Sequence, residues 1–172
     1  MYRPIWYFNM ITIEPITPQK ALTLKDVRLR ALQDTPSAFG STHAREALFT
    51  DEMWIVRATL QPDRVTYLAM DGQEACGIIG GFLNLEEGPR VTLVSMWVAP
   101  THRCVGVGQQ LVQAITGWAK AQSVGRLFLQ VTNNNDLAIA FYQRIGFAKT
   151  GRTEPYPNDP NLVEYEMSKD IS

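Results

Sequence analysis

Apolar residues in the first third of the chain recur mainly at helical spacing, after one short alternating run. The alternation predicts a strand at 11–14, and Thr17 before Pro18 is typical of the start of a helix, which Pro36 would end. The expected buried side of this helix consists of Leu22, Val27, Leu29 and Leu32. After a loop with room for one helical turn, a second helix is expected to follow Thr50, with apolar positions at Trp54, Ile55, Ala58 and Leu60.

The middle of the chain has the pattern of strands. Three candidates lie at 65–70, 76–85 and 91–98, and the turn sequences MDGQ and EEGP separate them, so consecutive strands should be antiparallel. The period then changes, which predicts a helix over 106–122, followed by an apolar strand at 126–131. A helix that bridges two strands of one sheet is a crossover connection, so these two strands should be parallel.

The last part of the chain returns to strands after one more helix. The sequence NNNDLAIAFYQRIG predicts a helix with a polar cap and a stop at Gly146, and FAKTGRTEPY and LVEYEMS predict two closing strands. No linker, internal repeat or low-complexity tract divides the chain. Residues 1–172 are therefore expected to form one domain of the mixed α/β (α+β) class.

Residues 1–9 are expected to be an extension that precedes this domain. Their apolar and aromatic side chains make a cluster too large to leave in water, so the extension should pack on its own domain or on a neighbouring copy. The second arrangement leaves a homodimer open.

Composition excludes several classes of protein. A formal net charge of −1 gives no basic excess for a nucleic-acid partner, and no apolar run is long enough to span a bilayer. Two cysteines and two histidines are too few for an expected metal site or a disulfide framework. The sequence therefore predicts a cytoplasmic protein with reduced thiols, without a nucleic-acid or membrane partner.

Two glycines stand one residue apart in HRCVGVGQQL, where the helix at 106–122 should begin. The free N–H groups of a first helical turn attract anions, glycine lets a ligand approach the backbone, and Arg103 adds a positive charge suited to phosphate. The glycines do not fit a P-loop, because Gln109 and Gln110 follow them, or a dinucleotide fingerprint, because Leu111 stands at the third glycine position. A diphosphate cradle of another kind and a simple packing role both remain open.

The combination of VSMWVAPTHRCVGVGQQLV with NNNDLAIAFYQRIGF closely resembles the GNAT superfamily of acetyl-CoA-dependent N-acyltransferases, over roughly 66–167. The resemblance implies a mixed, mostly antiparallel sheet of about seven strands flanked by about four helices. It implies acetyl-CoA as cosubstrate, no metal, and a β-bulge in the strand that ends at Trp97 and Val98. In this sequence Cys104 and Val105 stand where the family often has a glycine and a basic residue.

The same resemblance assigns roles to individual residues. The backbone around Trp97 and Val98 would pair with pantetheine, Asn135 would touch the pantetheine arm, and Tyr142 would face the sulfur as the catalytic residue. The remaining implied cofactor-binding residues, around the diphosphate, are Arg103, Cys104, Val105, Gly106, Val107, Gly108 and Gln109.

Tyr142 is the candidate that protonates the departing thiolate. With reference pKa values near 10 for a phenol and near 8.5 for a thiol, complete proton transfer is uphill by roughly 2 kcal/mol. Tyr142 would therefore either only hydrogen-bond the sulfur or have a pKa lowered by its surroundings. Its periodicity alone favours a core tyrosine beside Phe141.

The general base and the acceptor site are less defined by the sequence. Candidate bases in hairpins or loops are Glu86, Glu87 and Glu154, with Ser95 as a relay through water, and no base is assigned. Aromatic residues for an acceptor pocket, which would otherwise be core, are Phe39, Phe49, Trp54 and Trp97. His43 and His102 are expected at the surface. The loops that face the acceptor are expected at 36–50 and 153–161.

The expected function is transfer of an acetyl group from acetyl-CoA to a primary amine of a small molecule or a peptide. Three alternatives are transfer of a longer acyl group, a catalytically silent acyl-CoA-binding or regulatory domain, and a nucleotide-phosphate binder that does not use CoA. Fold alone does not distinguish substrates.

Overall fold

A computed structural model describes residues 10–86 and 88–172. The expectation for the extension 1–9 and the candidate base Glu87 lie outside the described residues. The described residues form seven strands: β1 (Thr12–Pro15), β2 (Arg64–Asp71), β3 (Glu74–Asn84), β4 (Arg90–Val98), β5 (Arg126–Thr132), β6 (Ala148–Pro155) and β7 (Val163–Asp170). The α-helices are α1 (Ala21–Asp34), α2 (His43–Glu46), α3 (Asp51–Ala58), α4 (Val107–Ala121) and α5 (Asp136–Arg144). Short 3₁₀ turns occupy Pro18–Lys20, Pro36–Ala38 and Pro100–His102.

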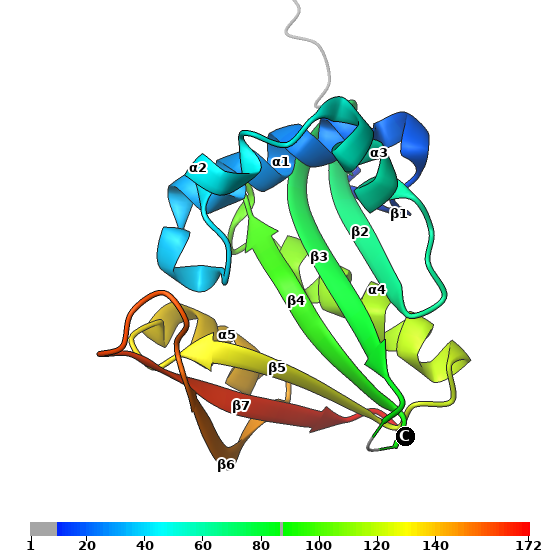
Figure 1. Ribbon diagram of the computed structural model, residues 1–172. Coiled ribbons are helices and arrows are strands. Elements are labelled where there is room, and N and C mark those ends of the chain that lie inside the picture. The colour runs from blue at the N-terminus through cyan, green and yellow to red at the C-terminus, as the bar shows by residue number, and fades with distance from the viewer. Residues whose placement is uncertain (1–9, 87) are drawn as a thin grey trace, which may run out of the picture.

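The seven strands form one sheet in the order β1-β2-β3-β4-β5-β7-β6 (Figure 1). Every neighbouring pair is antiparallel except β4 and β5, which are parallel and joined by α4. This confirms the predicted mixed α/β class, the antiparallel order of the three middle strands and the helical crossover. The described chain has five α-helices rather than about four, because the loop after α1 contains the four-residue α2.

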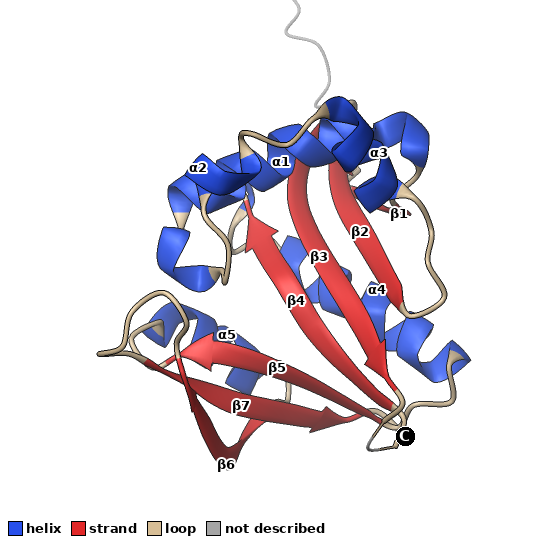
Figure 2. Cartoon of the chain, viewed as in Figure 1, coloured by secondary structure: helices blue, strands red, loops and turns tan. Residues whose placement is uncertain are grey.

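Helices cover both faces of the sheet (Figure 2). On one face α4 packs against β2, β3 and β4, and a Cβ at Gly77 or Gly81 of β3 would lie 3.1 Å from Leu111 or Ile115 of α4. The small residues of β3 therefore let a long apolar helix approach the sheet closely. On the other face lies α1, whose Asp34 accepts a hydrogen bond from the indole of Trp97 in β4.

The structure confirms some of the helix signals in the sequence and contradicts others. The side chain of Thr50 caps α3 as predicted, by accepting a hydrogen bond from the Met53 amide. Thr17 makes no such bond, because a 3₁₀ turn precedes α1. Leu22 is exposed, contrary to the prediction, because α1 begins only at residue 21 and buries the side of Leu24 and Val27 instead. Ile55 and Leu60 are exposed as well.

Among residues 10–86 and 88–172 no helix has both the length and the apolar character needed to cross a membrane. The same residues contain no group of three or more His, Cys, Asp or Glu side chains that could hold a metal ion.

Candidate active site

The site lies where β4 and β5 separate. These strands pair only over residues 91–93 and 127–129, near the beginning of each strand. Beyond Leu93 they diverge, and Figure 1 shows the wedge between them. The backbone of β4 after residue 93 thus has no strand partner on its β5 side, and such an edge can accept an extended ligand as an additional strand.

A β-bulge in β4 shapes this edge. Ile78 of β3 pairs with Trp97, whereas Gly80 pairs with Val94, so Ser95 and Met96 together face a single residue of β3. Ser95 has a φ of +56°, which is uncommon for a residue other than glycine. The bulge implied by the resemblance is therefore present, two residues before Trp97, and it bends the strand beside the site.

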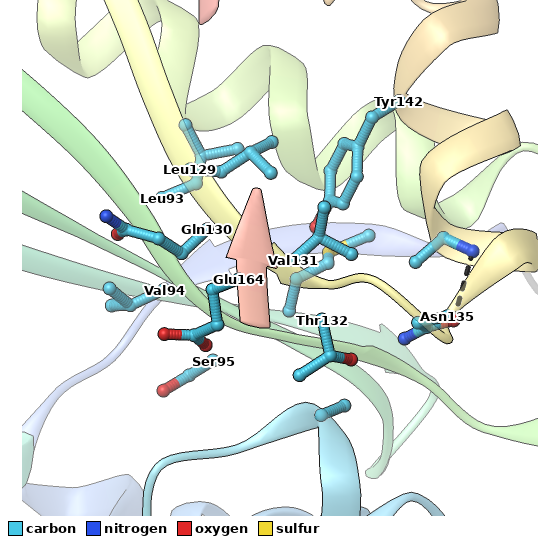
Figure 3. A pocket seen from close by; sticks show the side chains of 13 residues that line it. Leu93, Val94, Ser95, Leu129, Gln130, Val131, Thr132, Asn135, Tyr142 and Glu164 are labelled. Atoms are coloured by element: carbon cyan, nitrogen blue, oxygen red, sulfur yellow. Dashed lines mark hydrogen bonds between the residues drawn. The ribbon is translucent and has the colours of Figure 1, made fainter. Parts of the chain in front are cut away.

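A cavity fills the wedge between the two strands. Its walls come from residues 93–96 of β4, 129–132 of β5, the start and inner side of α5, Ala38, and Glu164 of β7. Tyr142 extends into it from α5 (Figure 3). The side-chain carbonyl of Asn135, which also lines the cavity, accepts a hydrogen bond of 3.2 Å from the Ala138 amide and so caps α5.

The electrostatic setting of Tyr142 decides between two expectations. Its side chain is 7% exposed and contacts the rings of Phe141 and Phe147, and burial raises the pKa of Tyr142. The alternative of a lowered pKa is wrong, because within the described chain no positive charge or helix start offsets the desolvation. The phenol stays protonated at neutral pH and can donate a hydrogen bond into the cavity.

The two glycines of HRCVGVGQQL serve different purposes. Gly106 has a φ of +91° and precedes the first residue of α4, and within the described chain nothing lies within 4 Å of where its Cβ would be. Cys104 also has a positive φ, of +64°. A Cβ at Gly108 would lie 3.1 Å from both Met96 and Phe141. Gly106 therefore provides backbone conformation at an open surface, whereas Gly108 permits close packing.

Arg103 is held by groups of the protein itself. Its Nε donates to the Val98 carbonyl at 2.9 Å, and its guanidinium forms an ion pair with Asp34 of α1. Asp34 also accepts from the indole of Trp97. Burial acts to raise the pKa of Asp34, but these hydrogen bonds and the charge of Arg103 outweigh it, so the pKa is lowered. Arg103 thus joins the loop before α4 to α1 while 42% of its side chain stays exposed.

The loops at 36–50 and 153–161, which the sequence places at the acceptor, touch each other. The Tyr156 hydroxyl and the Asn158 amide both donate to the carbonyl of Phe39, at 2.8 and 3.1 Å. Ala38, next to that carbonyl, lines the cavity. These contacts join the loop that carries Ala38 to the connection from β6 to β7.

A buried ion pair supports the same wall. Arg28 of α1 donates two hydrogen bonds to Glu46, at 2.9 and 3.0 Å, and a third of 3.2 Å to the Ser95 hydroxyl. Glu46 is 2% exposed and also accepts from Arg57. Burial acts to raise the pKa of Glu46, but the hydrogen bonds and charge of Arg28 and the charge of Arg57 outweigh it and lower the pKa. The network fixes Ser95 at the bulge.

Sequence reasoning missed three polar residues of the cavity: Gln130, Thr132 and Glu164. Thr132 is 3% exposed, and its hydroxyl has no hydrogen-bond partner within residues 10–86 and 88–172. Burial, followed by the negative charge of Glu154, raises the pKa of Glu164. The sequence did hold a signal for Glu164, because the predicted strand LVEYEMS places this carboxylate among apolar residues. Of the other candidate bases, Glu154 pairs with Glu164 across β6 and β7, and Glu86 lies in the distant hairpin after β3.

The aromatic and histidine candidates have mainly structural positions. Trp54 is fully buried and packs on Phe49, away from the cavity, so both belong to the core between α1 and α3. Trp97 is buried against Asp34. His102 is half-buried rather than at the surface, because its Nε2 lies 3.0 Å from Asp71 Oδ2.

Comparisons with known proteins agree with this geometry. The profile described as the acetyltransferase (GNAT) family matches residues 28–147. Streptothricin acetyltransferase of Streptomyces lavendulae is 42% identical over 62 residues, which are 36% of this chain and 33% of that protein. N-alpha-acetyltransferase RimI of Mycobacterium tuberculosis is 29% identical over 73 residues, 42% of this chain and 44% of that protein. The matched segments thus span less than half the length of these curated relatives.

A solved structure extends the similarity to the whole fold. The paia N-acetyltransferase of Thermoplasma acidophilum, in complex with coenzyme A, has a TM-score of 0.69 and covers 94% of this chain and 99% of that chain. The two sequences are 16% identical, so this similarity concerns the fold.

Proposed function

Because this chain belongs to the acetyltransferase (GNAT) family, we propose that it transfers the acetyl group of acetyl-CoA to a primary amine of a small molecule or a peptide. The observation that carries the proposal is the cavity between the separated β4 and β5, with the bulged edge of β4 on one side and Tyr142 on the other. The names of the matched streptothricin and N-alpha-acetyltransferases support amine acceptors of these two kinds.

Acetyl-CoA would bind along the free edge of β4. The pantetheine amides can pair with the unpartnered backbone after Leu93. The side-chain carbonyl of Asn135 caps α5, so its NH₂ group is left to donate to a pantetheine carbonyl. The N–H groups at the start of α4 would hold the diphosphate. The proposed contacts are Trp97, Val98, Arg103, Cys104, Val105, Gly106, Val107, Gly108, Gln109, Asn135 and Tyr142.

The reaction needs a neutral amine, a polarised carbonyl and an acid for the thiolate. The amine nitrogen attacks the thioester carbon, the C–N bond forms, and the C–S bond breaks with its electron pair on sulfur. The protonated phenol of Tyr142 stabilises the departing thiolate by donating a hydrogen bond. The same burial raises the pKa of a thiol in this cavity, which favours the uptake of a proton by sulfur. A cytoplasmic location is part of the proposal.

The direct test is release of CoA from acetyl-CoA in the presence of a panel of primary amines and N-terminal peptides, followed with a thiol-reactive dye. We expect amine-dependent release of CoA with at least one acceptor. By calorimetry, we expect the protein to bind acetyl-CoA more tightly than ATP. Binding of acetyl-CoA without amine-dependent release, across the panel, would contradict the proposed activity.

A further inference from the structure

Three side chains form a row across the last strands of the sheet, beside the cavity. Thr132 of β5 pairs directly with Glu164 of β7, and Glu164 pairs directly with Glu154 of β6. Directly paired residues of neighbouring strands place their side chains on the same face, with Cβ atoms about 4.5–5.5 Å apart. The row therefore runs on one face from the cavity wall, through Glu164, to the exposed Glu154.

The two carboxylates of the row differ from Glu166, a neighbouring acid on β7. In the described part of the chain neither the Glu154 nor the Glu164 side chain has an ion-pair or hydrogen-bond partner. Glu166, two residues farther along the same strand, forms an ion pair with Arg90 and accepts a hydrogen bond from Thr150. The row thus carries negative charge that the protein itself leaves uncompensated.

Thr132 provides an independent indication of a ligand. Its hydroxyl is buried in the wall of the cavity and has no partner in the described residues, although a buried hydroxyl without a hydrogen bond is costly. Figure 3 shows Glu164, Thr132 and Ser95 among the side chains that line this cavity. A ligand that donates hydrogen bonds and carries positive charge would satisfy both residues.

We propose that the row Thr132, Glu164 and Glu154 is the acceptor subsite, and that it takes a primary amine carrying a second positive charge. The reacting ammonium group lies between Thr132 and Glu164, and the second cation lies near Glu154. This inference rests on the proposed function and names the acceptor class for it. The spacing of the row suits two cations separated by a short aliphatic chain.

Glu164 also accepts the proton that the acceptor must lose. The ammonium group gives one proton to the Glu164 carboxylate, and the neutral nitrogen then attacks the thioester carbon. When the C–S bond breaks, nitrogen loses a second proton and the thiolate gains one, so that the products are the amide, CoA and one proton released from Glu164.

Several charged groups surround Glu164. The charge of Glu154 on β6 favours the protonated form of Glu164, whereas Glu166 on β7 is neutralised by Arg90 of β4. Arg28 of α1 reaches Ser95 in the same cavity, but its guanidinium is shared with Glu46. Burial is the main cause of the raised pKa of Glu164 and the charge of Glu154 adds to it, so removing that charge should move the acid limb of the pH profile to lower pH.

The test compares 1,4-diaminobutane with butylamine, which has the same carbon chain and one positive charge fewer. The protein should show kcat/KM about two- to fivefold higher for the diamine, since an exposed charge pair contributes modestly. Glu154→Gln should abolish this preference, and Glu164→Gln should lower kcat/KM about 100-fold or more and remove the acid limb. Glu164→Asp should recover part of the activity. The matched control is Glu86→Gln, which removes an exposed carboxylate far from the cavity and should change neither quantity.

The outcomes separate the inference from the proposed function. Equal kcat/KM for the two amines, a preference for butylamine, or an unchanged pH profile in Glu164→Gln would overturn the inference while acetyl transfer stands. So would an enzyme that accepts neither amine but acetylates others in the panel. Absence of CoA release with every amine would instead refute the proposed function. Calorimetric binding of acetyl-CoA should be unchanged in Glu154→Gln and in Glu164→Gln.

Discussion

Replacing Tyr142 with phenylalanine removes one hydroxyl from the cavity and leaves the ring in place. The ring packs against Phe141 and Phe147, with centroid distances of 5.2 and 5.6 Å, so Tyr142→Phe should retain the fold. No hydrogen bond from the hydroxyl to another described residue would be lost, and the change therefore isolates what the hydroxyl does for the substrate.

The size of the effect follows from the role that the structure permits. Since burial raises the pKa of Tyr142, its phenol donates a hydrogen bond to the thiolate rather than completing a proton transfer. A hydrogen bond to a charged group contributes about 1.5–3 kcal/mol, so kcat should fall roughly 10- to 150-fold. The full range of general acid catalysis, about 10²–10⁴-fold, should not be reached.

The measurement is CoA release at saturating acetyl-CoA and acceptor, with a single-turnover experiment to establish that the chemical step is observed. Acetyl-CoA affinity and melting temperature should match the wild type. Tyr67→Phe is the control, because Tyr67 of β2 is a half-buried tyrosine that does not line the cavity. A single-turnover rate for Tyr142→Phe equal to that of the wild type would refute the reasoning and make Tyr142 a core residue only.

Two further changes test the supporting structure. Gly106→Val should weaken acetyl-CoA binding about 5- to 150-fold, because a valine at a φ of +91° costs roughly 1–3 kcal/mol of backbone strain, whereas Gly106→Asn should bind more tightly than the valine variant because asparagine tolerates this conformation. Equal affinities by calorimetry would argue against a backbone role. Glu46→Gln leaves Arg28 buried without its partner and should lower the free energy of unfolding by about 3 kcal/mol, measured in urea. Because the folded pKa of Glu46 is lowered, its contribution is present above the unfolded pKa and is lost as pH falls through the folded pKa, so the difference between wild type and variant should shrink in acid.

The sequence by itself determined the elements and the family. Periodicity located α4 and β5 because a long apolar stripe at helical spacing has one stable arrangement against a sheet, and the crossover it makes fixes parallel strands. The two glycine-containing motifs identified the family, since both constrain the backbone locally: Gly106 needs a positive φ, and Asn135 caps α5 within its own turn.

Only the tertiary structure decided the chemistry around these elements. Arg103 looks like a free phosphate ligand in the sequence, but its partner Asp34 lies 69 residues away. Burial in the assembled core raises the pKa of Tyr142. The position of Tyr142 on a helix did not determine whether its pKa is raised or lowered. Thr132, Glu164 and Glu154 belong to three strands, and only the register of the sheet brings them into one row. Local backbone preferences are carried by neighbouring residues, but burial, charge pairing and strand register depend on residues that only the fold brings together.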